Sequence, residues 1–304
     1  MKDWCSEKVS FGRVGKKFFP DRQLKRVWPL TGGVSAQTTA LEFFEGGNEP
    51  TKVVVRCHGE IDRSQNPNIA ADEFMLLQQL KVKGIPVPTP YYLDQSCEIL
   101  PTPYLILQHI NGRPEFDPSH LTKFIHQVAT HLADIHRLDI TTLDLSFLPK
   151  QGKGFGERPQ ILDDSLNEGE IRDRLEMLWP LPTVNQTALL HGDFWPGNVL
   201  WQAGQLIAII DWEDAHLGDP VSDLANSRLE TLWAFGVEAM HQLTAVYQSL
   251  MPTINLNHLP YWDLCAALRP ASNLSEWGLD PETEQRMRDQ HKLFITQAFK
   301  DLGL

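Results

Sequence analysis

The stretch 188–225 holds the residues whose types and spacing could do chemistry, and it reads ALLHGDFWPGNVLWQAGQLIAIIDWEDAHLGDPVSDLA. Asp193 follows a short apolar segment, Asn198 comes five residues later, and an apolar run over 206–210 leads into Asp211. Carboxylate and amide oxygens carried on neighbouring loops can converge on one hard cation. Asp211 and Asn198 are therefore the expected cation ligands, which leaves Asp193 for a proton or for orienting a nucleophile.

This arrangement resembles the catalytic set of kinases, in which a catalytic-loop Asp is followed five residues later by an Asn and a metal-binding Asp opens the next loop. Protein kinases read H-R-D and D-F-G at these places. The chain is instead similar to the aminoglycoside phosphotransferase-like family of small-molecule kinases, which includes choline kinase-like proteins. The similarity lies in four strings: His191-Gly192-Asp193, Asp211-Trp212-Glu213, Gly218-Asp219-Pro220 and Asp223-Leu224-Ala225.

The resemblance implies an α+β, protein-kinase-like fold with two lobes. Residues 1–110 would form an N-terminal nucleotide-binding lobe with a small antiparallel β-sheet, one helix and the hinge strand. Residues 111–304 would form a larger, mostly helical lobe that holds the catalytic loop and the acceptor site. The hydrophobic pattern agrees, because 38–44 and 52–56 are typical of strands, whereas 70–83, 121–138 and four segments after residue 225 have helical spacing.

By resemblance, Arg56 of the small lobe would contact the phosphates of the nucleotide, and Glu73 would pair with this arginine. Arg56 ends a buried strand where kinases usually place a lysine, and Glu73 matches the acidic residue that pairs with this base. An arginine fork is not interchangeable with an ammonium, so Arg56 departs from the family pattern. The alternative interpretation of Glu73 is an exposed acid that favours the dipole of its helix.

Four further positions are expected to contact the nucleotide through the main chain. Gly33 and Ser35 belong to a Gly-Gly-x-Ser turn whose N–H groups could approach an anion, and the family has a flap over the phosphates here. The alternative is a plain hairpin turn. By resemblance, Gln108 and Ile110 would bind adenine at the hinge, with Leu107 behind it.

In the large lobe, the resemblance assigns roles to five polar residues of the stretch 188–225. Asp193 would accept or orient the proton of a substrate hydroxyl. Asn198 and Asp211 would hold Mg²⁺ against the triphosphate of ATP or GTP. Asp223 would open the next helix and brace the catalytic loop, and His191 would orient that loop.

The acceptor is the part of the function that the sequence leaves open. Glu213 fits a second metal or a substrate amine, and it fits an exposed loop acid equally well. In related kinases the C-terminal helices build the acceptor pocket, and here they carry acids (Glu230, Asp263) and aromatics (Trp233, Trp262, Trp277, Tyr247, Tyr261). Such a lining would favour an amine through charge and cation–π contacts, but most of these aromatics are expected to be helix core.

Composition narrows the class of partner. The 304 residues have 42% hydrophobic and 22% charged residues, as in ordinary globular proteins. Net charge is −12, which argues against nucleic-acid and anionic-membrane surfaces. It suits a cationic substrate or simple solubility. The four cysteines are scattered and the N-terminus lacks the apolar core of a signal peptide, so a cytoplasmic protein with reduced thiols is expected.

The function expected from the sequence is ATP- and Mg²⁺-dependent transfer of the γ-phosphate to a hydroxyl of a small molecule, with cationic acceptors such as aminoglycosides, choline or amino alcohols among the candidates. A nucleotide-binding regulatory module, or pseudokinase, of the same fold is the alternative. A protein kinase is disfavoured because its marks are missing. A metal-dependent hydrolase would need more His and Asp ligands near Asp193. The sequence specifies no oligomeric state.

Overall fold

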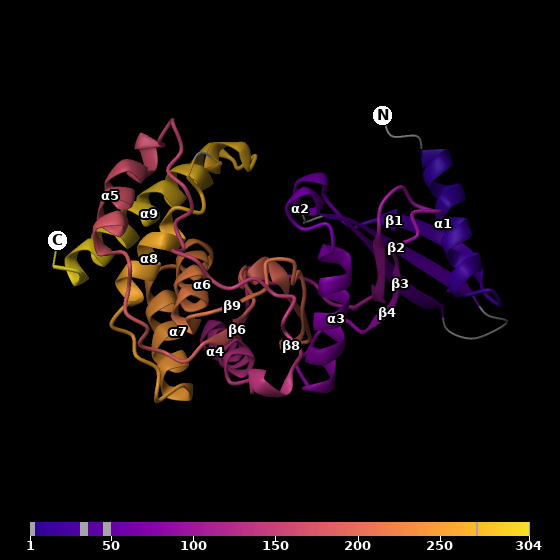
Figure 1. The fold of residues 1–304 in the computed structure, drawn as a ribbon, viewed down its shortest axis with the longest axis horizontal. Helices are drawn as coiled ribbons and strands as arrows, with labels where there is room; N and C mark the ends of the chain where they lie inside the picture. The colour runs from indigo at the N-terminus through magenta and orange to yellow at the C-terminus, as the bar shows by residue number, and fades with distance from the viewer. Residues whose placement is uncertain (1–3, 31–35, 45–49, 272, 304) are drawn as a thin grey trace. The chain divides into compact units, whose positions relative to one another are not determined.

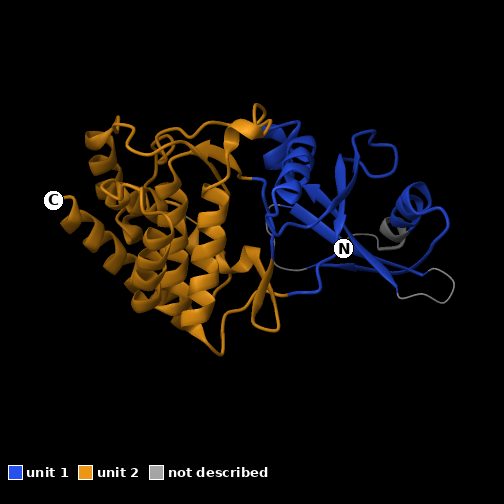
Figure 2. Cartoon of the chain, turned by 90° about the horizontal axis from the view of Figure 1, so that it is seen from below, with its two compact units in different colours: residues 1–112, 208–213 blue, residues 113–207, 214–304 orange. Residues whose placement is uncertain are grey.

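The computed structural model describes residues 4–30, 36–44, 50–271 and 273–303. The chain divides into two compact units (Figure 2). The first comprises residues 1–112 and 208–213, and the second comprises residues 113–207 and 214–304. The short segment 208–213 therefore belongs with residues that come far earlier in the chain.

The first unit is built on a five-stranded antiparallel sheet with strand order β1-β2-β3-β5-β4. The strands are β1 (Gln23–Pro29), β2 (Ala36–Phe44), β3 (Thr51–His58), β4 (Pro90–Asp94) and β5 (Tyr104–Gln108). Successive side chains of a strand point to opposite faces. Val53 and Val55 of β3 therefore share one face of the sheet, and Arg56 and His58 share the other.

Helices cover both faces of this sheet (Figure 1). On one face, α1 (Trp4–Phe18) packs Phe11 and Val14 into a core cluster with Val53 and Val55. On the other face lies α3 (Ile69–Val82), which follows the short helix α2 (Glu60–Gln65). Helix α3 thus covers the face from which Arg56 projects. Glu73, the residue expected to pair with this arginine, lies on α3.

The second unit is mainly helical. Its α-helices are α4 (Leu121–His136), α5 (Glu168–Leu178), α6 (Pro220–Phe235), α7 (Val237–Leu250), α8 (Leu259–Ala267) and α9 (Pro281–Asp301). The described residues of this unit also form the 3₁₀ turns η1 (Ile140–Thr142), η2 (Asp164–Leu166), η3 (Pro196–Asn198) and η4 (Leu274–Glu276). The predicted α+β class is thus confirmed. Within the described residues, the helices are too short or too polar for any to cross a membrane.

Two small antiparallel ribbons lie within the stretch 188–225. β6 (Ala188–Leu190) pairs with β9 (His216–Gly218), and β7 (Val199–Gln202) pairs with β8 (Gln205–Ile209). β6 is completely buried. The residues 191–198 between β6 and β7 form one loop, whose two ends are fixed by these ribbons.

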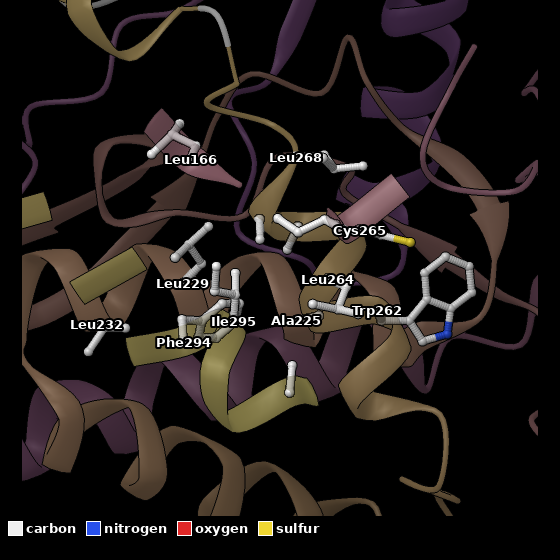
Figure 3. Close-up of a cluster of buried hydrophobic side chains, with 14 of the residues drawn as sticks. Leu166, Ala225, Leu229, Leu232, Trp262, Leu264, Cys265, Leu268, Phe294 and Ile295 are labelled. Atoms are coloured by element: carbon white, nitrogen blue, oxygen red, sulfur yellow. The ribbon is translucent and has the colours of Figure 1, made fainter. Parts of the chain in front are cut away.

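The aromatic residues of the C-terminal helices are mostly core. Trp233 and Trp262 are 5% exposed, and Tyr247 and Tyr261 are fully buried. Trp262 packs with Leu264, Cys265 and other apolar residues of one large cluster (Figure 3). The interpretation as helix core therefore holds for these four residues, whereas Trp277 is 46% exposed.

Helix α6 begins six residues before the start that hydrophobic spacing suggests, at Pro220 instead of residue 226. The side chain of Asp219 accepts a hydrogen bond of 3.0 Å from the N–H of Val221, which makes Asp219 the N-cap. Pro220 occupies the first turn, where its missing N–H is not needed. Asp219 thus opens the helix, and Asp223 lies in its first turn rather than at its start.

Candidate active site

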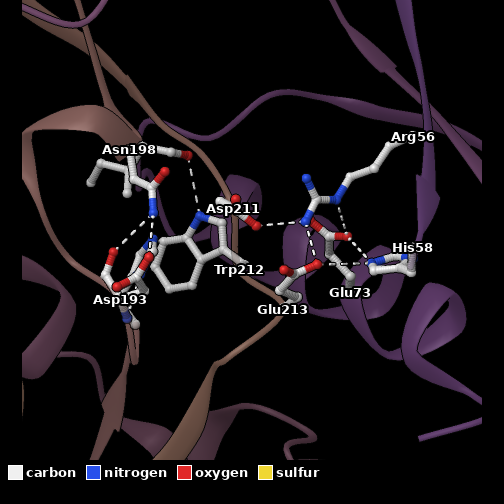
Figure 4. A network of polar contacts seen from close by, with 10 residues as sticks. Arg56, His58, Glu73, Asp193, Asn198, Asp211, Trp212 and Glu213 are labelled. Carbon is white, nitrogen blue, oxygen red and sulfur yellow. Dashed lines mark hydrogen bonds and ion pairs between the residues drawn. The ribbon is translucent and has the colours of Figure 1, made fainter. Parts of the chain in front are cut away.

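The residues singled out from the sequence fall into two groups, one in each unit (Figure 4). Arg56, Glu73, Asp211 and Glu213 belong to the first unit. Asp193 and Asn198 belong to the second unit, as does Asp223.

In the first unit, a single guanidinium gathers three carboxylates. Arg56 Nε lies 3.0 Å from Glu73 Oε2, so the expected ion pair is present. Its Nη2 lies 2.5 Å from Asp211 Oδ1 and 2.6 Å from Glu213 Oε2. Glu73 is 4% exposed and is therefore no surface acid, and Glu213 is an ion-pair partner rather than an exposed loop residue.

His58 completes this cluster. It ends β3 two residues after Arg56, on the same face, and its Nε2 lies 2.7 Å from Glu73 Oε2. Its side chain is buried. Glu73 thus receives two partners from one strand, which fixes the position of α3 against β3.

Burial and charge act in opposite directions on these groups. Burial alone would lower the pKa of Arg56, but the charges of Glu73, Asp211 and Glu213 raise it above its usual range, so the guanidinium stays charged. Burial alone would raise the pKa of Glu73, but Arg56 and the hydrogen bond with His58 lower it to about 2. With three carboxylates around one guanidinium, the cluster holds a surplus of negative charge that a further cation could neutralise.

Asp211 itself has an unusual backbone conformation. Its φ of 67° lies in the left-handed region, which costs a non-glycine residue on the order of 1–3 kcal/mol. Close by, the buried indole of Trp212 donates a hydrogen bond of 3.1 Å to the carbonyl of Ile209, and the N–H of Ile209 donates to the carbonyl of Pro86 at 2.7 Å. These contacts tie the segment after β8 to the first unit and stabilise a conformation that aims the carboxylate of Asp211 at Arg56.

In the second unit, Asp193 and Asn198 face each other across the catalytic loop. Asn198 Nδ2 donates hydrogen bonds of 3.0 Å to both the backbone carbonyl and Oδ2 of Asp193. The turn η3 makes this possible, because it brings residue 198 back toward residue 193. Since the amide nitrogen is committed to Asp193, the atom that Asn198 can offer to a cation is its amide oxygen, which suits an oxygen-seeking ion such as Mg²⁺. The sharing of one ion by Asn198 and Asp211 stays a prediction.

Asp223 supports the catalytic loop from α6. Its carboxylate is 2% exposed and accepts hydrogen bonds from the backbone N–H groups of His191 (2.7 Å) and Gly192 (3.0 Å). His136 Nε2 lies 3.3 Å from the same carboxylate, and His136 Nδ1 lies 2.7 Å from the hydroxyl of Tyr247. Burial alone would raise the pKa of Asp223, but the hydrogen bond and charge of His136 lower it to about 2. The carboxylate is therefore ionised and well suited to hold the loop.

Two neighbours of Asp193 show how tightly the loop is built. The backbone N–H of Asp193 donates to His191 Nδ1 at 3.2 Å, in line with the expected orienting role of His191. Gly192 has φ of 84°, and a Cβ atom there would lie 2.2 Å from the carbonyl oxygen of Asp214. Only glycine fits this position without a change of the backbone.

Sequence reasoning missed Arg269, which follows α8. Its Nη2 lies 2.7 Å from Asp193 Oδ1, and its Nη1 donates to the carbonyl of Gly192 at 2.6 Å. Glu230 of α6 also interacts electrostatically with Asp193. Burial and the charge of Asp193 raise the pKa of Glu230 to about 7, while Arg269 lowers it. No motif marks a single arginine 76 residues after Asp193, so the sequence held no signal for this contact.

The structure says less about the residues predicted to contact the nucleotide through the main chain. Gln108 ends β5, and its N–H donates to the carbonyl of Thr89 at 2.8 Å, so an adenine contact at Gln108 would use its carbonyl. The contacts of adenine with Gln108 and Ile110 stay predictions. Gly33 and Ser35 lie outside the described residues.

Comparison with known families decides the class of protein. The model of the phosphotransferase enzyme family matches residues 29–254. The chain belongs to this family. The match includes both groups of site residues, from Arg56 to Asp223.

Curated relatives of this phosphotransferase family member include longer proteins. Acyl-CoA dehydrogenase family member 11 of Rattus norvegicus is 26% identical over 290 residues, which are 80% of this chain and 35% of that protein. The chain spans between a fifth and about a third of the length of the acyl-CoA dehydrogenase relatives that it matches.

Solved structures share the fold of this phosphotransferase family member at low identity. The GDP complex of aminoglycoside 2'-phosphotransferase-IIIa has a TM-score of 0.66 and 17% identity, and the match covers 96% of this chain and 99% of that one. A thermostable mutant of the aminoglycoside phosphotransferase APH(4)-Ia, in a ternary complex with AMP-PNP and hygromycin B, has a TM-score of 0.60 and 18% identity, with 95% and 98% covered. These likenesses confirm the predicted α+β, kinase-like fold.

Proposed function

We propose that the protein is an ATP- and Mg²⁺-dependent phosphotransferase that moves the γ-phosphate of the nucleotide to a hydroxyl of a small molecule in the cytoplasm. The observation that carries this proposal is the structure of the catalytic loop. Asp193 and Asn198 are hydrogen-bonded to each other there, and the ionised Asp223 accepts hydrogen bonds from the backbone N–H groups just before Asp193. Phosphoryl transfer requires positioning and charge neutralisation rather than covalent chemistry by the protein, and a rigid loop of this kind supplies the positioning.

The nucleotide side of the proposal rests on the cluster around Arg56. Its guanidinium would bind phosphate oxygens, and arginine favours such contacts because its planar fork matches oxyanion geometry. Asp211 and the amide oxygen of Asn198 would hold Mg²⁺, which supplies neutralisation of the charge on the phosphates. Arg56 is a counter-ion of Asp211. Binding of Mg-ATP would therefore replace part of this ion pair.

The acceptor side rests on Asp193, whose side chain is 29% exposed. A carboxylate within about 2.6–3.2 Å of a hydroxyl can orient it and accept its proton. The hydroxyl oxygen would then form the new bond to the γ-phosphorus, while the bond from that phosphorus to the bridging oxygen of ADP breaks. The solved relatives that hold GDP, or AMP-PNP with hygromycin B, support a nucleotide donor and a small-molecule acceptor.

A coupled assay of ADP release with Mg-ATP tests the proposal directly. We expect ADP release that depends on one class of hydroxyl compound, together with binding of Mg-ATP measured by thermal shift. Binding of Mg-ATP without any acceptor-dependent turnover would favour the alternative, a nucleotide-binding regulatory module of the same fold. Absence of nucleotide binding would contradict both functions.

A further inference from the structure

Arg269 places a positive charge directly beside the carboxylate that would receive the acceptor. Its side chain is 44% exposed and that of Asp193 is 29% exposed, so both can be reached from solvent. The two nitrogens of Arg269 contact Asp193 Oδ1 and the carbonyl of Gly192. The guanidinium is therefore anchored to the catalytic loop.

This contact restricts the chemistry of the acceptor near its reacting hydroxyl. A hydroxyl that hydrogen-bonds to Asp193 lies within about 3 Å of its carboxylate, while Arg269 Nη2 lies 2.7 Å from Oδ1 of that carboxylate. A hydroxyl on Oδ1 therefore lies within about 6 Å of Arg269 Nη2, and one on Oδ2 lies within about 8 Å. Groups a few bonds from the hydroxyl come within reach of Arg269, where a cation is repelled and an anion is attracted.

Glu230, the acid next to the pair of Arg269 and Asp193, does not reverse this preference for an anion. Glu230 is half-buried on α6. Burial and Asp193 raise its pKa to about 7, so a large share of its side chains is uncharged at neutral pH. It is therefore a weak partner for a substrate ammonium. The net charge of −12 is a property of the whole chain, and salt screens charges farther away than about 8–10 Å.

We propose that the acceptor carries an oxyanion, a carboxylate or a phosphate, a few bonds from its reacting hydroxyl, and that Arg269 binds this group. The inference rests on the proposed function and deepens it, because it names the charge class of the acceptor. An arginine fork is the side chain best suited to a carboxylate or phosphate. An anionic acceptor differs from the cationic acceptor that the acidic composition of the chain suggests.

The test uses hydroxyl compounds that share a skeleton and differ in charge. 3-Hydroxybutyrate, its neutral amide and 4-amino-2-butanol form one series, and glycerol 3-phosphate against glycerol forms a second that separates phosphate from carboxylate. Each compound is given with Mg-ATP to the wild-type protein, to Arg269→Gln and to Arg137→Gln. Arg137 is a matched control, because its side chain is 46% exposed and pairs with Asp134 of the same unit.

We expect the anionic member of a series to be the preferred acceptor, with kcat/KM at least tenfold above its neutral and cationic counterparts. Arg269→Gln should remove this preference and leave the KM for Mg-ATP at the wild-type value. Arg137→Gln should keep both the acceptor preference and the KM for Mg-ATP of the wild type. Preference for the neutral or cationic member would overturn the inference, as would an unchanged anion preference in Arg269→Gln.

A binding measurement decides the matter if no compound of the panel is phosphorylated. Thermal unfolding is followed with each compound in the presence and absence of Mg-AMP-PNP. The inference requires a rise in Tm with the anions that is lost in Arg269→Gln, and it is wrong if no such Arg269-dependent shift occurs. The proposed function fails separately, through the absence of a Tm shift with Mg-AMP-PNP alone.

Discussion

The carboxylate of Asp223 accepts a hydrogen bond of 2.7 Å from the backbone N–H of His191. It accepts a second, of 3.0 Å, from the N–H of Gly192. A side chain of α6 therefore sets the path of the main chain that leads into Asp193. The geometry of the proposed catalytic carboxylate thus depends on a residue that need not touch either substrate.

Replacing this carboxylate should disturb both stability and turnover. In Asp223→Asn, the amide accepts through one oxygen only, and its NH₂ group meets a backbone N–H that needs an acceptor. We expect the free energy of unfolding to fall by about 2–4 kcal/mol and kcat to fall at least tenfold. Urea unfolding and ADP release measure the two effects. Asp134→Asn, at an exposed ion pair of the same unit, is the control and should behave as the wild type.

Gly192→Ala should be far more harmful than an ordinary glycine substitution. The residue has a positive φ of 84°, and its new Cβ would lie 2.2 Å from the carbonyl oxygen of Asp214. Gly204 provides the matched control, because it has φ of 73° and no atom within 4 Å of its hypothetical Cβ. We expect Gly204→Ala to cost about 1–2 kcal/mol through backbone strain alone. Equal losses of stability in the two variants would show that the close approach at Gly192 is unimportant.

Arg56 should tolerate neither removal nor replacement by lysine. Arg56→Ala leaves Glu73 buried beside His58 alone, and loss of one partner from a buried ion pair costs about 3–5 kcal/mol. Arg56→Lys keeps the charge, but one ammonium cannot reproduce a fork that reaches Glu73, Asp211 and Glu213. We expect this variant to fold with reduced stability and with a raised KM for Mg-ATP. Arg26→Lys on β1 is the control, and an unchanged KM in Arg56→Lys would rule out a phosphate contact that depends on the fork.

The raised pKa of Glu230 predicts a pH dependence of stability. The native protein binds this proton with a pKa of about 7, whereas a glutamate ordinarily titrates near 4.5. The native state thus holds more protons between these values, and the stability that this proton provides is lost as pH rises from about 4.5 to about 7. Glu230→Gln should therefore gain in Tm relative to the wild type as pH increases across this window.

Thermal unfolding between pH 5 and pH 8 measures this difference. Burial also raises the pKa of Asp263, to about 6, although Arg228 opposes the shift. That contribution is common to both proteins and cancels in the comparison. Glu238→Gln, on the exposed side of α7, controls for loss of a charge. Parallel Tm curves for the wild type and Glu230→Gln would contradict the assignment.

The contact between Asp193 and Asn198 could be predicted from the sequence, because residues so close in the chain lie on one loop. Five residues separate Asp193 from Asn198, and one loop closes over this distance. The pairing of Arg56 with Glu73 was expected from the family resemblance, and the helical spacing of 70–83 placed Glu73 on a helix.

Contacts made by tertiary packing could not be predicted in this way. Arg269 reaches Asp193 only because α8 packs against α6, and nothing in the residues around position 269 indicates this. His58 joins the cluster because β3 extends two residues beyond the strand 52–56 that the apolar pattern indicates. The segment 208–213 belongs to the first unit although it follows the catalytic loop. The expected division at residue 110 is a single cut, and a single cut cannot assign a later segment to the first unit.

The most direct test of the account compares acceptor-dependent ADP release by the wild type and by Asp193→Asn, with the dissociation constant of Mg-ATP measured for both. Asparagine keeps an oxygen for the hydrogen bond from Asn198 Nδ2 but cannot accept the proton of a hydroxyl. The account predicts a fall in kcat of about 10²–10⁴-fold with nearly unchanged binding of Mg-ATP. Full phosphoryl transfer by Asp193→Asn would contradict it.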